Sequence, residues 1–377
     1  MTQSLSSSEP AVKHTLMLVT NDFEPDQRVR KEAQSLLRFG MHVSVICLNR
    51  LPQYSAASRS VEGIAVHSVS SGPLSPGRLW SLGKSLVVFY IKSLCVARLI
   101  DKRRRVHVIH CHDLDTLVLG WLLKTMFRVP LIYDMHDWYP SYFHSKMARR
   151  MMSAIDSWFC QTAEGLIVVN DHFQNAIRRK RDDVKVIMNT PVLEGHGPVA
   201  ATGVGLFYSG NLDSLRDMRY AMDTFRECGL PVELVGDGPL YSDYRTMSLD
   251  SRIRVPGRVS AEAVVELTKD CFAVLALYDT SHPNNRLATP NKVFEAMKFG
   301  KPSLVSGGTV MADIVESEGC GIAVEYGNAE SLRAAIEMLK LPDVYRKMSQ
   351  NGCTAFLRSY NWQAMESRLW TLYEDLL

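Results

Sequence analysis

The feature that most constrains the fold is a repeated alternation of short apolar runs with longer amphipathic stretches. Runs such as 15–20 (TLMLVT), 42–48 (HVSVICL) and 272–279 (FAVLALYD) are nearly all apolar, which indicates strands buried on both faces. Strands of this kind, separated by helices, form parallel sheets covered by helices. The sequence therefore predicts an α/β fold built from βα units.

The alternation is interrupted once and then restarts. Residues 190–203 (TPVLEGHGPVAATG) are rich in proline, glycine and small residues and have no periodicity, and a length of 377 residues suits two domains. We therefore expect two tandem Rossmann-like domains. The predicted parts are a disordered tail at 1–11, a first domain at 12–190, a linker at 191–203, a second domain at 204–360 and a closing helix at 361–377.

Composition excludes several classes of function. The net charge of +3 is too small to indicate a nucleic-acid-binding protein, and the eight cysteines show neither CxxC pairs nor metal-ligand spacing. Reduced thiols and the absence of a signal-peptide pattern at 1–10 indicate a cytoplasmic protein. The apolar segment 85–100 contains Lys92 and is short for a membrane span, so it is interpreted as a buried or interfacial helix.

Basic residues are concentrated in the first half of the chain. They occur at 101–107 (DKRRRVH), 146–152 (KMARRMM) and 178–181 (RRKR). Two interpretations are open, namely solvated helix ends or a basic face toward anionic lipid or an anionic acceptor.

One predicted helix carries an unusual lysine. In 286–302 (RLATPNKVFEAMKFGKP), Thr289 suits a cap, Pro290 the first helical position and Gly300 the end. Lys292 would then lie in the first turn, where the helix dipole disfavours a cation, with Glu295 on the same face. Either the two form a surface ion pair, or Lys292 binds an anionic diphosphate while Glu295 accepts hydrogen bonds from a ribose diol.

Glycines and cations follow several strands of the second half. Ligands of open parallel sheets bind at the carboxyl ends of the strands, and glycine there lets the backbone approach a ligand closely. Arg216 follows the first of these strands by a few residues and adds positive charge. The pattern suits a diphosphate site. The residues at the strand ends are Gly210, Asn211, Gly236, Asp237, Gly238, Gly257 and Arg258.

Polar residues also end strands of the first half. His110, His112 and Asp113 end one strand, and His136 follows the next. A His-x-His-Asp pattern raises the possibility of a metal, but no second ligand cluster is evident, so we predict none. His136 suits contact with a sugar hydroxyl or a developing charge, or a core or capping role. Asp22, Asp26, Arg28 and Lys31 follow the first strand and suit contact with an acceptor or helix capping.

These motifs together resemble the retaining, GT-B-fold glycosyltransferases of family 4. The resemblance rests on DQRVRKEAQSLLRFGMHVSVI, VIHCHDLDTLVLG and LIYDMHDWYP in the first half, and on YSGNLDSLRDM, LVGDGP, VPGRV and TPNKVFEAMKFGKP in the second. It implies two Rossmann-like domains facing across a cleft, with the helix in 361–377 crossing back to the first domain. In this family the second domain binds a nucleotide diphosphate sugar and the first binds the acceptor.

The resemblance implies a role for each matching residue. Glu295 would bind the ribose, Arg216 and Lys292 would neutralise the departing diphosphate, and His136 would touch the donor sugar near its anomeric carbon. Neither a metal nor a cofactor is implied. Further donor-side residues would be Gly210, Asn211, Gly236, Gly238, Arg258 (beside the base), Ala288, Thr289 and Asn291, and candidates on the acceptor side are Asp22, Arg28, His112 and Asp113.

The chain departs from the family pattern in two places. Many members have two glutamates separated by seven residues, whereas here the first of these positions is Leu287 and only Glu295 remains. A subset with PNK before the helix shares this departure, and backbone N–H groups near Ala288 and Thr289, or Asn285, would replace the missing carboxylate. The usual Gly-Gly turn after the first strand is also absent, which indicates a different acceptor pocket.

The function implied is a metal-independent hexosyltransferase that uses a nucleotide sugar, with a UDP-sugar favoured over a GDP-sugar. Its acceptor would be a lipid-linked or growing cell-surface saccharide, reached at the inner face of the membrane through peripheral contact with anionic lipid. Two alternatives are kept: a UDP-sugar 2-epimerase of the same fold, and a non-catalytic partner that binds a nucleotide sugar.

Overall fold

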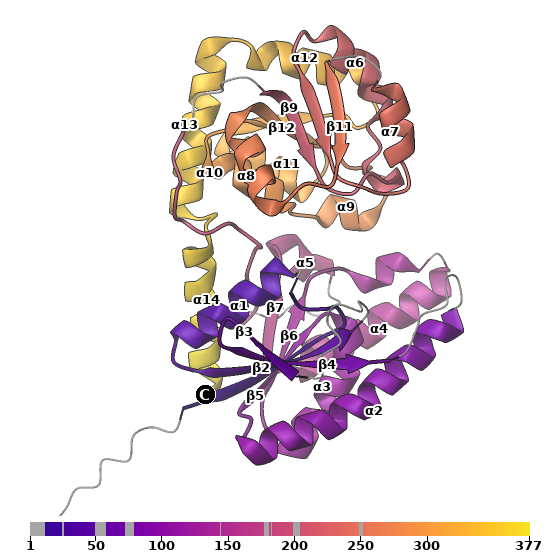
Figure 1. Cartoon of the computed structure of the whole chain (residues 1–377), viewed down its shortest axis with the longest axis vertical. Helices are drawn as coiled ribbons and strands as arrows, with labels where there is room; N and C mark the ends of the chain where they lie inside the picture. The colour runs from indigo at the N-terminus through magenta and orange to yellow at the C-terminus, as the bar shows by residue number, and fades with distance from the viewer. Residues whose placement is uncertain are drawn as a thin grey trace, which may run out of the picture. The chain divides into compact units, whose positions relative to one another are not determined.

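The chain forms two compact units, each with its own parallel sheet (Figure 1). The computed structural model describes residues 12–24, 26–49, 58–71, 79–143, 145–176, 181, 183–198, 204–248 and 252–377. The first unit comprises Met1–Ile187 and Glu366–Leu377, and the second comprises Met188–Met365. The tail predicted at 1–11 and the linker segment 199–203 lie outside the described residues.

The first unit is built on an eight-stranded sheet in the order β3-β4-β2-β1-β5-β6-β7-β8. All neighbouring strands pair in parallel except β3 and β4. All residues of β1, β5, β6 and β7 are buried, as their apolar sequences predicted. The strands are β1 (His14–Val19), β2 (His42–Asn49), β3 (Ser58–Val61), β4 (Ile64–Ser70), β5 (Val108–His112), β6 (Leu131–Met135), β7 (Gly165–Val168) and β8 (Lys185–Val186).

Helices connect these strands. Helix α1 begins after Asp26, whose side chain accepts hydrogen bonds from the N–H groups of Arg28 and Val29, so the predicted cap is confirmed. No helix among the described residues is both long enough and apolar enough to span a membrane. The helices are α1 (Gln27–Arg38), α2 (Leu79–Arg103), α3 (Leu114–Phe127), the 3-10 turn η2 (Tyr139–Tyr142), α4 (Lys146–Thr162) and α5 (Asp171–Ala176).

Strand β3 was not predicted from the sequence. It pairs antiparallel with β4 through a two-residue turn at Glu62 and Gly63, both of which have positive φ (52° and 86°). Such turns favour glycine, so Gly63 is a signal for the hairpin. The burial of β3 alternates between exposed and half-buried residues, as expected at a sheet edge, and so its sequence is not apolar.

The second unit contains a six-stranded, all-parallel sheet in the order β11-β10-β9-β12-β13-β14. The strand order reverses direction between β9 and β12, so the carboxyl ends of these strands border the crevice where such sheets bind ligands. The strands are β9 (Val204–Ser209), β10 (Val232–Val235), β11 (Ile253–Gly257), β12 (Cys271–Ala276), β13 (Ser303–Ser306) and β14 (Gly321–Val324).

The helices of the second unit cover its sheet on both sides (Figure 1). The start of α10 differs from the prediction, because Pro290 is the capping residue and no side chain caps the helix, so Thr289 does not act as the cap. The elements are η3 (Ser214–Arg216), η4 (Arg219–Ala221), α6 (Met222–Glu227), α7 (Tyr241–Met247), α8 (Ala261–Asp270), α9 (Pro283–Leu287), α10 (Asn291–Lys298), α11 (Val310–Glu318), α12 (Ala329–Leu339) and α13 (Pro342–Arg358).

The last helix, α14 (Trp362–Leu376), returns to the first unit. The hydroxyl of Tyr373 lies 2.9 Å from Nδ1 of His110 on β5, and Arg38 of α1 pairs with Glu366. Both Tyr373 and Leu369 are fully buried. The predicted crossing of the C-terminal helix back to the first unit is thereby confirmed, as is the α/β fold of two parallel-sheet domains.

Candidate functional site

The strand ends of the second unit are built from glycines in a backbone conformation that side chains disfavour. Gly210 follows β9, and Gly236 and Gly238 follow β10, with φ values of 148°, 146° and 149°. A Cβ atom on Gly236 would lie 1.7 Å from the carbonyl oxygen of Gly210. The two loops therefore touch backbone to backbone, and this contact fixes the outline of the crevice.

Lys292 on α10 is buried, and its ammonium group has no hydrogen-bond partner within the described part of the chain. Its side chain is about 9% exposed. The ammonium nitrogen instead lies 3.7 Å from the centre of the Tyr208 ring, and it would be 3.2 Å from a Cβ placed on Gly210. A buried cation without a carboxylate is expensive, so this lysine is poised for an anion at the glycine loop.

The protonation of Lys292 reflects this burial. Desolvation lowers its pKa to about 7, and the positive charge of Arg216 acts in the same direction, while Glu295 and Asp213 partly oppose it. An anion placed beside Nζ would raise the pKa again. We therefore expect an anion that binds beside Nζ to be accompanied by the uptake of a proton.

Arg216 adds a second cation to the same place. Its guanidinium lies 5.0 Å from the centre of the Tyr278 ring and donates a hydrogen bond of 2.9 Å to Asp213. Tyr278 and Tyr208 both face Lys292 as well, at 5.5 and 3.7 Å from Nζ to the ring centres. Tyr208, Tyr278 and Asp213 were missed from the sequence, because the two tyrosines were counted only as apolar strand residues.

Glu295 lies three residues after Lys292 on α10 and is half-buried. No hydrogen bond joins Nζ of Lys292 to it, and the lysine is buried, so the alternative of a surface ion pair between these residues is wrong. Their spacing and shared face on α10 are as the sequence indicated.

The other donor-side candidates lie around this centre with differing exposure. Ala288 and Thr289 are half-buried, and Asn291 and Asn211 are exposed. Arg258 is largely exposed, and its Nε lies 3.5 Å from Asp237 on the neighbouring loop.

Asn285 has a structural task that the sequence did not reveal. Its side-chain nitrogen donates to the carbonyl oxygens of Leu215 (3.0 Å) and Asp279 (2.9 Å). Both N–H groups of the amide are therefore used. The side-chain nitrogen of Asn285 is thus engaged within the protein, and the expectation that Asn285 replaces the carboxylate missing at Leu287 stays a prediction.

The first unit has its own polar centre, organised by Asp134 on β6. This carboxylate is fully buried and binds Arg28 through a bond of 2.7 Å from Nη2 to Oδ1. Its other oxygen, Oδ2, lies 2.7 Å from Nε2 of His136 and 3.1 Å from Nδ1 of His112. Arg28 also donates a hydrogen bond of 2.8 Å to the carbonyl oxygen of Ile187. The guanidinium of this α1 residue therefore contacts both β6 and the residue that follows β8.

His136 stands between two carboxylates. Asp134 contacts one ring nitrogen, and Oδ2 of Asp113 lies 3.5 Å from the other, Nδ1. Burial disfavours the charged ring, but the two carboxylates outweigh it and raise the pKa of His136 to about 10. Asp113 also accepts hydrogen bonds from the backbone N–H groups of His136 (3.0 Å) and Asp137 (3.3 Å), which fixes the ring at the strand end.

The remaining polar residues of this centre are fully inside the unit. His110 and His112 stack at 4.4 Å between ring centres, and burial lowers the pKa of both. Glu32 of α1 lies 3.2 Å from Nε of Arg28, and burial together with the charge of Asp134 raises its pKa. Arg28 and His112 are buried and both contact Asp134, which in turn contacts His136; their place on the acceptor side stays a prediction.

One group of atoms resembles a metal-ligand set. Glu32, His110, His112 and Asp134 each offer a ligand atom within 4.8 Å of the others. The guanidinium of Arg28 already lies against Glu32 and Asp134, and the two imidazoles are stacked rather than converging. The charge that a metal ion would supply is therefore already provided by an arginine, and the group fits a metal poorly.

Two further observations concern the sequence candidates. Asp22 is buried, and its backbone carbonyl oxygen accepts a hydrogen bond from Arg59 at 3.5 Å. Asp134 and Glu32 were missed, although signals existed. Asp134 precedes His136 by two residues, and Glu32 follows Arg28 by four, on the same helix face.

Comparison with known protein families matches both halves of the chain. Residues 25–190 match the family described as "Glycosyl transferase 4-like domain". Residues 203–340 match the family described as "Glycosyl transferases group 1". A search of curated proteins finds no significant match.

Solved structures share the fold over nearly the whole chain. Sucrose-phosphate synthase from Thermosynechococcus elongatus has a TM-score of 0.77 at 18% identity, with 97% of this chain and 99% of that chain covered. HepE from Anabaena in complex with UDP has a TM-score of 0.73 at 16% identity, with coverage of 97% and 100%. A UDP-N-acetylglucosamine 2-epimerase reaches 0.61 at 16% identity, covering 96% and 97%. At these identities the likeness is one of fold.

Proposed function

Because the chain belongs to the glycosyltransferases with a 4-like first domain and a group 1 second domain, we propose that it is a retaining, metal-independent hexosyltransferase using a nucleotide diphosphate sugar. In this reaction the bond between the anomeric carbon and the diphosphate breaks. The acceptor oxygen forms the new bond on the same face of the sugar, and the nucleoside diphosphate leaves.

The observation that carries the proposal is the unpartnered ammonium group of Lys292 beside the glycine loops. A diphosphate at the start of α10 would give this buried cation its missing counter-charge. Arg216, facing the same tyrosines, would contact the same anion. Cations held in place before the reaction stabilise the negative charge that develops on the leaving group, which is why this arrangement suits glycosyl transfer.

The other residues take roles consistent with their positions. Glu295 would accept hydrogen bonds from the ribose diol, and Arg258 would lie near the base. His136 would contact the donor sugar near the anomeric carbon. The N–H groups near Ala288 and Thr289, or the side chain of Asn285, would replace the carboxylate absent at Leu287. Asn211, Asn291 and the glycines would bind the diphosphate through the backbone or neighbouring polar groups.

A UDP-sugar is the favoured donor, and no further cofactor is proposed. Support comes from HepE, whose structures contain UDP and UDP-glucose and which shares the fold. Calorimetric titration with UDP, GDP and ADP tests the choice of base directly. We expect UDP to bind at least tenfold more tightly than the other two, and equal or reversed affinities would reject this part of the proposal.

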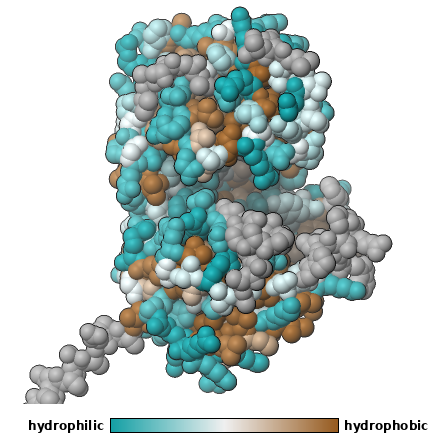
Figure 2. All heavy atoms as spheres, viewed as in Figure 1, coloured by the Kyte–Doolittle hydropathy of each residue, from teal (hydrophilic) through white to brown (hydrophobic). Residues whose placement is uncertain are grey.

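The acceptor is proposed to be a lipid-linked or growing saccharide, reached at the surface of an anionic membrane. The first unit exposes large apolar side chains on α2 and α4, and those of α4 lie close in sequence to Lys146, Arg149 and Arg150. Figure 2 shows apolar residues at the surface of this unit among hydrophilic ones. Apolar side chains beside cations are typical of peripheral membrane contact. The exposed fractions are 60% for Ile91, 57% for Leu99, 81% for Met147, 58% for Met151 and 47% for Trp158.

Co-sedimentation with phosphatidylglycerol vesicles tests this contact. The double variant Met147→Glu with Met151→Glu should lose most of the binding, because two charges replace the apolar contact. Met338→Glu, an exposed methionine on α12 of the second unit, is the matched control and should bind like the wild type. Binding of the double variant at the control level would reject membrane contact through α4.

Two other functions are separated by a product assay. A 2-epimerase shares the fold and would convert UDP-N-acetylglucosamine to its 2-epimer without an acceptor. A non-catalytic partner would bind the nucleotide sugar and leave it intact. A transferase releases the nucleoside diphosphate, slowly by hydrolysis when no acceptor is present. Detection of the epimer, or of binding without any release, would replace the proposal.

A further inference from the structure

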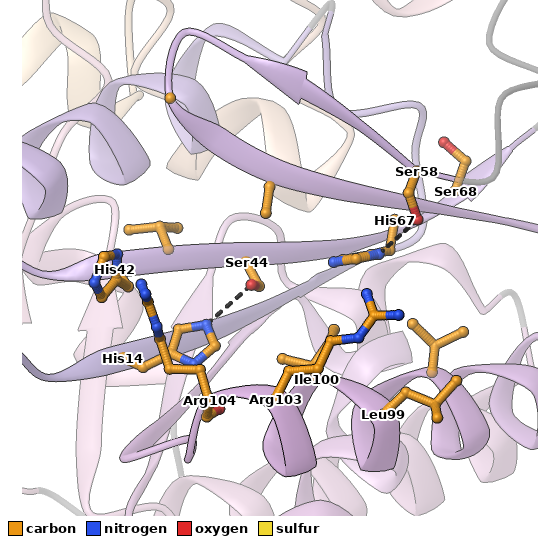
Figure 3. A pocket seen from close by; sticks show the side chains of 14 residues that line it. His14, His42, Ser44, Ser58, His67, Ser68, Leu99, Ile100, Arg103 and Arg104 are labelled. Atoms are coloured by element: carbon orange, nitrogen blue, oxygen red, sulfur yellow. Dashed lines mark hydrogen bonds between the residues drawn. The ribbon is translucent and has the colours of Figure 1, made fainter.

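A pocket of about 610 Å³ lies in the first unit beside the amino ends of β1 and β2. The polar centre around His136 lies at the opposite, carboxyl ends of the strands. His14 and His42 begin β1 and β2, and both line the pocket, together with the last turn of α2 (Figure 3). Asp113 and His136 lie at the carboxyl ends of β5 and β6. A six-residue strand such as β1 spans about 20 Å, so the two places are separated by the length of the sheet.

The pocket is lined by apolar side chains of β2, β4 and α2 together with histidines, serines and two arginines, and no carboxylate is among the described residues that line it. Arg103 and Arg104 reach from the end of α2 toward β2 and β4, where His42, His67 and Ser44 lie (Figure 3). Neither guanidinium donates a hydrogen bond or forms an ion pair within the part of the chain that the structure describes. Arginine at a helix end is favoured by the helix dipole, but the side chains point over the strands rather than back at α2.

The surroundings of His42 and His67 in the pocket favour the binding of an anion. Burial and the charge of Arg103 lower the pKa of His67, and burial and Arg104 lower that of His42. His14 forms the floor, with Nδ1 donating to the carbonyl oxygen of Arg104 (3.1 Å) and Nε2 accepting from the hydroxyl of Ser44 (2.9 Å). A negatively charged ligand would offset the repulsion between each arginine and its neighbouring histidine. It would therefore favour the protonated forms of His42 and His67.

We propose that this pocket is a second binding site, specific for a phosphate-bearing ligand and separate from the proposed nucleotide site. The guanidinium groups of Arg103 and Arg104 match the geometry of phosphate oxygens, and the imidazoles of His42 and His67 lie beside them. The volume is within the range of small-molecule pockets and exceeds the need of a bare phosphate, so a phosphorylated organic molecule fits. The same chemistry is presented by the phosphate of a lipid headgroup.

Calorimetric titration with pyrophosphate tests the site in the full-length chain. The variant Lys292→Met serves as the background, since it removes the anion site proposed in the second unit. We expect it to retain one saturable pyrophosphate site. Adding Arg103→Gln and Arg104→Gln should weaken that site at least tenfold. The imidazole resonances of His42 and His67 should shift on addition of pyrophosphate, and only when both arginines are present.

Lys102→Gln with Arg105→Gln is the matched control, because it removes the same charge from flanking positions that do not line the pocket. It should change the affinity by no more than about twofold, as expected for screened surface charges. A second arm measures binding to phosphatidylglycerol vesicles. Dependence on Arg103 and Arg104 in the vesicle arm alone supports the same phosphate chemistry and identifies a lipid headgroup as its source.

Behaviour of the arginine variant identical to the control in both arms would overturn the proposal. The result is independent of the proposed transferase activity, because the nucleotide site is tested by comparing wild type with Lys292→Met. Loss of the arginine site with nucleotide binding intact, or the reverse, is therefore readily distinguished.

Discussion

The Oδ2 atom of Asp134 lies 2.7 Å from Nε2 of His136, in the interior of the first unit. Asp134 also pairs with Arg28, so the histidine is fixed by a carboxylate that is itself fixed by an arginine. His136 keeps about a fifth of its side chain exposed, whereas Asp134 is fully buried. The partly exposed His136 is thus positioned by two buried residues.

Replacing Asp134 by asparagine should uncouple this arrangement. The charge that holds His136 protonated disappears, and Arg28 loses its buried partner, so we expect a loss of about 3 kcal/mol in the free energy of unfolding. The pKa of His136, followed by NMR, should fall by more than one unit. Asp137→Asn, an exposed neighbour, is the control. An unchanged His136 titration in Asp134→Asn would contradict the assigned contact.

The same ion pair predicts how stability varies with pH. The pKa of His136 is raised in the folded protein to about 10, against roughly 6.5 in the unfolded chain. Its stabilising contribution is therefore complete below pH 6.5 and is lost as the pH rises through 10. The stability difference between wild type and His136→Gln, measured by urea unfolding, should narrow from pH 7 to pH 10. A constant difference across that range would refute the predicted shift.

Gly236 tests the backbone contact between the two glycine loops. A Cβ atom there would collide with the carbonyl of Gly210 at 1.7 Å, and φ is 146°. We expect Gly236→Ala to lower the free energy of unfolding by about 3 kcal/mol and to abolish nucleotide binding. Gly308→Ala also has positive φ (70°) but meets no atom within 4 Å, and should cost about 1 kcal/mol. Equal effects of the two substitutions would show that strain alone, and not the loop contact, matters.

The sequence predicted the framework well and the burial of polar residues poorly. The parallel strands were predicted because residues such as those of β1 and β7 are mostly apolar on both faces, a pattern typical of strands buried in a parallel sheet. Strand β3 was not predicted because it lies at the sheet edge, where residues are partly exposed and need not be apolar. The depth of Arg28 could not be predicted either, since a charged residue becomes buried only when partners distant in sequence, here Asp134, meet it.

The donor-side residues were recognised by resemblance and by their strand-end positions, but their energetics came only from the structure. Lys292 was recognised as unusual from the sequence because the helix dipole disfavours a cation in the first turn. Its burial against Tyr208 and the lowered pKa depend on a tyrosine more than eighty residues away in the sequence, which no local pattern can connect to it. The hydrogen bonds from the side chain of Asn285 to the carbonyl oxygens of Leu215 and Asp279 could not be predicted from the sequence either.

The proposed roles of three residues predict distinct kinetic effects. Glu295→Ala should weaken UDP binding about tenfold, because a ribose hydroxyl loses its acceptor. Lys292→Met and Arg216→Gln should lower kcat by about 100-fold or more, with a smaller effect on donor affinity, since they act on charge that develops as the diphosphate leaves. Once the titrations with UDP, GDP and ADP have identified the base, steady-state kinetics with the matching nucleotide sugar measures kcat and donor affinity for each variant. Kinetics unchanged in all three variants would remove the proposed site.

The most direct test of the central claim is proton uptake on nucleotide binding. If the diphosphate is the counter-ion of Lys292, binding at pH 8 should raise a pKa that is about 7 in the free protein, and about one proton should enter per UDP bound. Calorimetry in two buffers of different ionisation enthalpy gives this number. We predict an uptake close to one proton in the wild type and close to zero in Lys292→Met, with weaker binding. Binding without proton uptake, at an affinity that Lys292→Met leaves unchanged, would contradict the account.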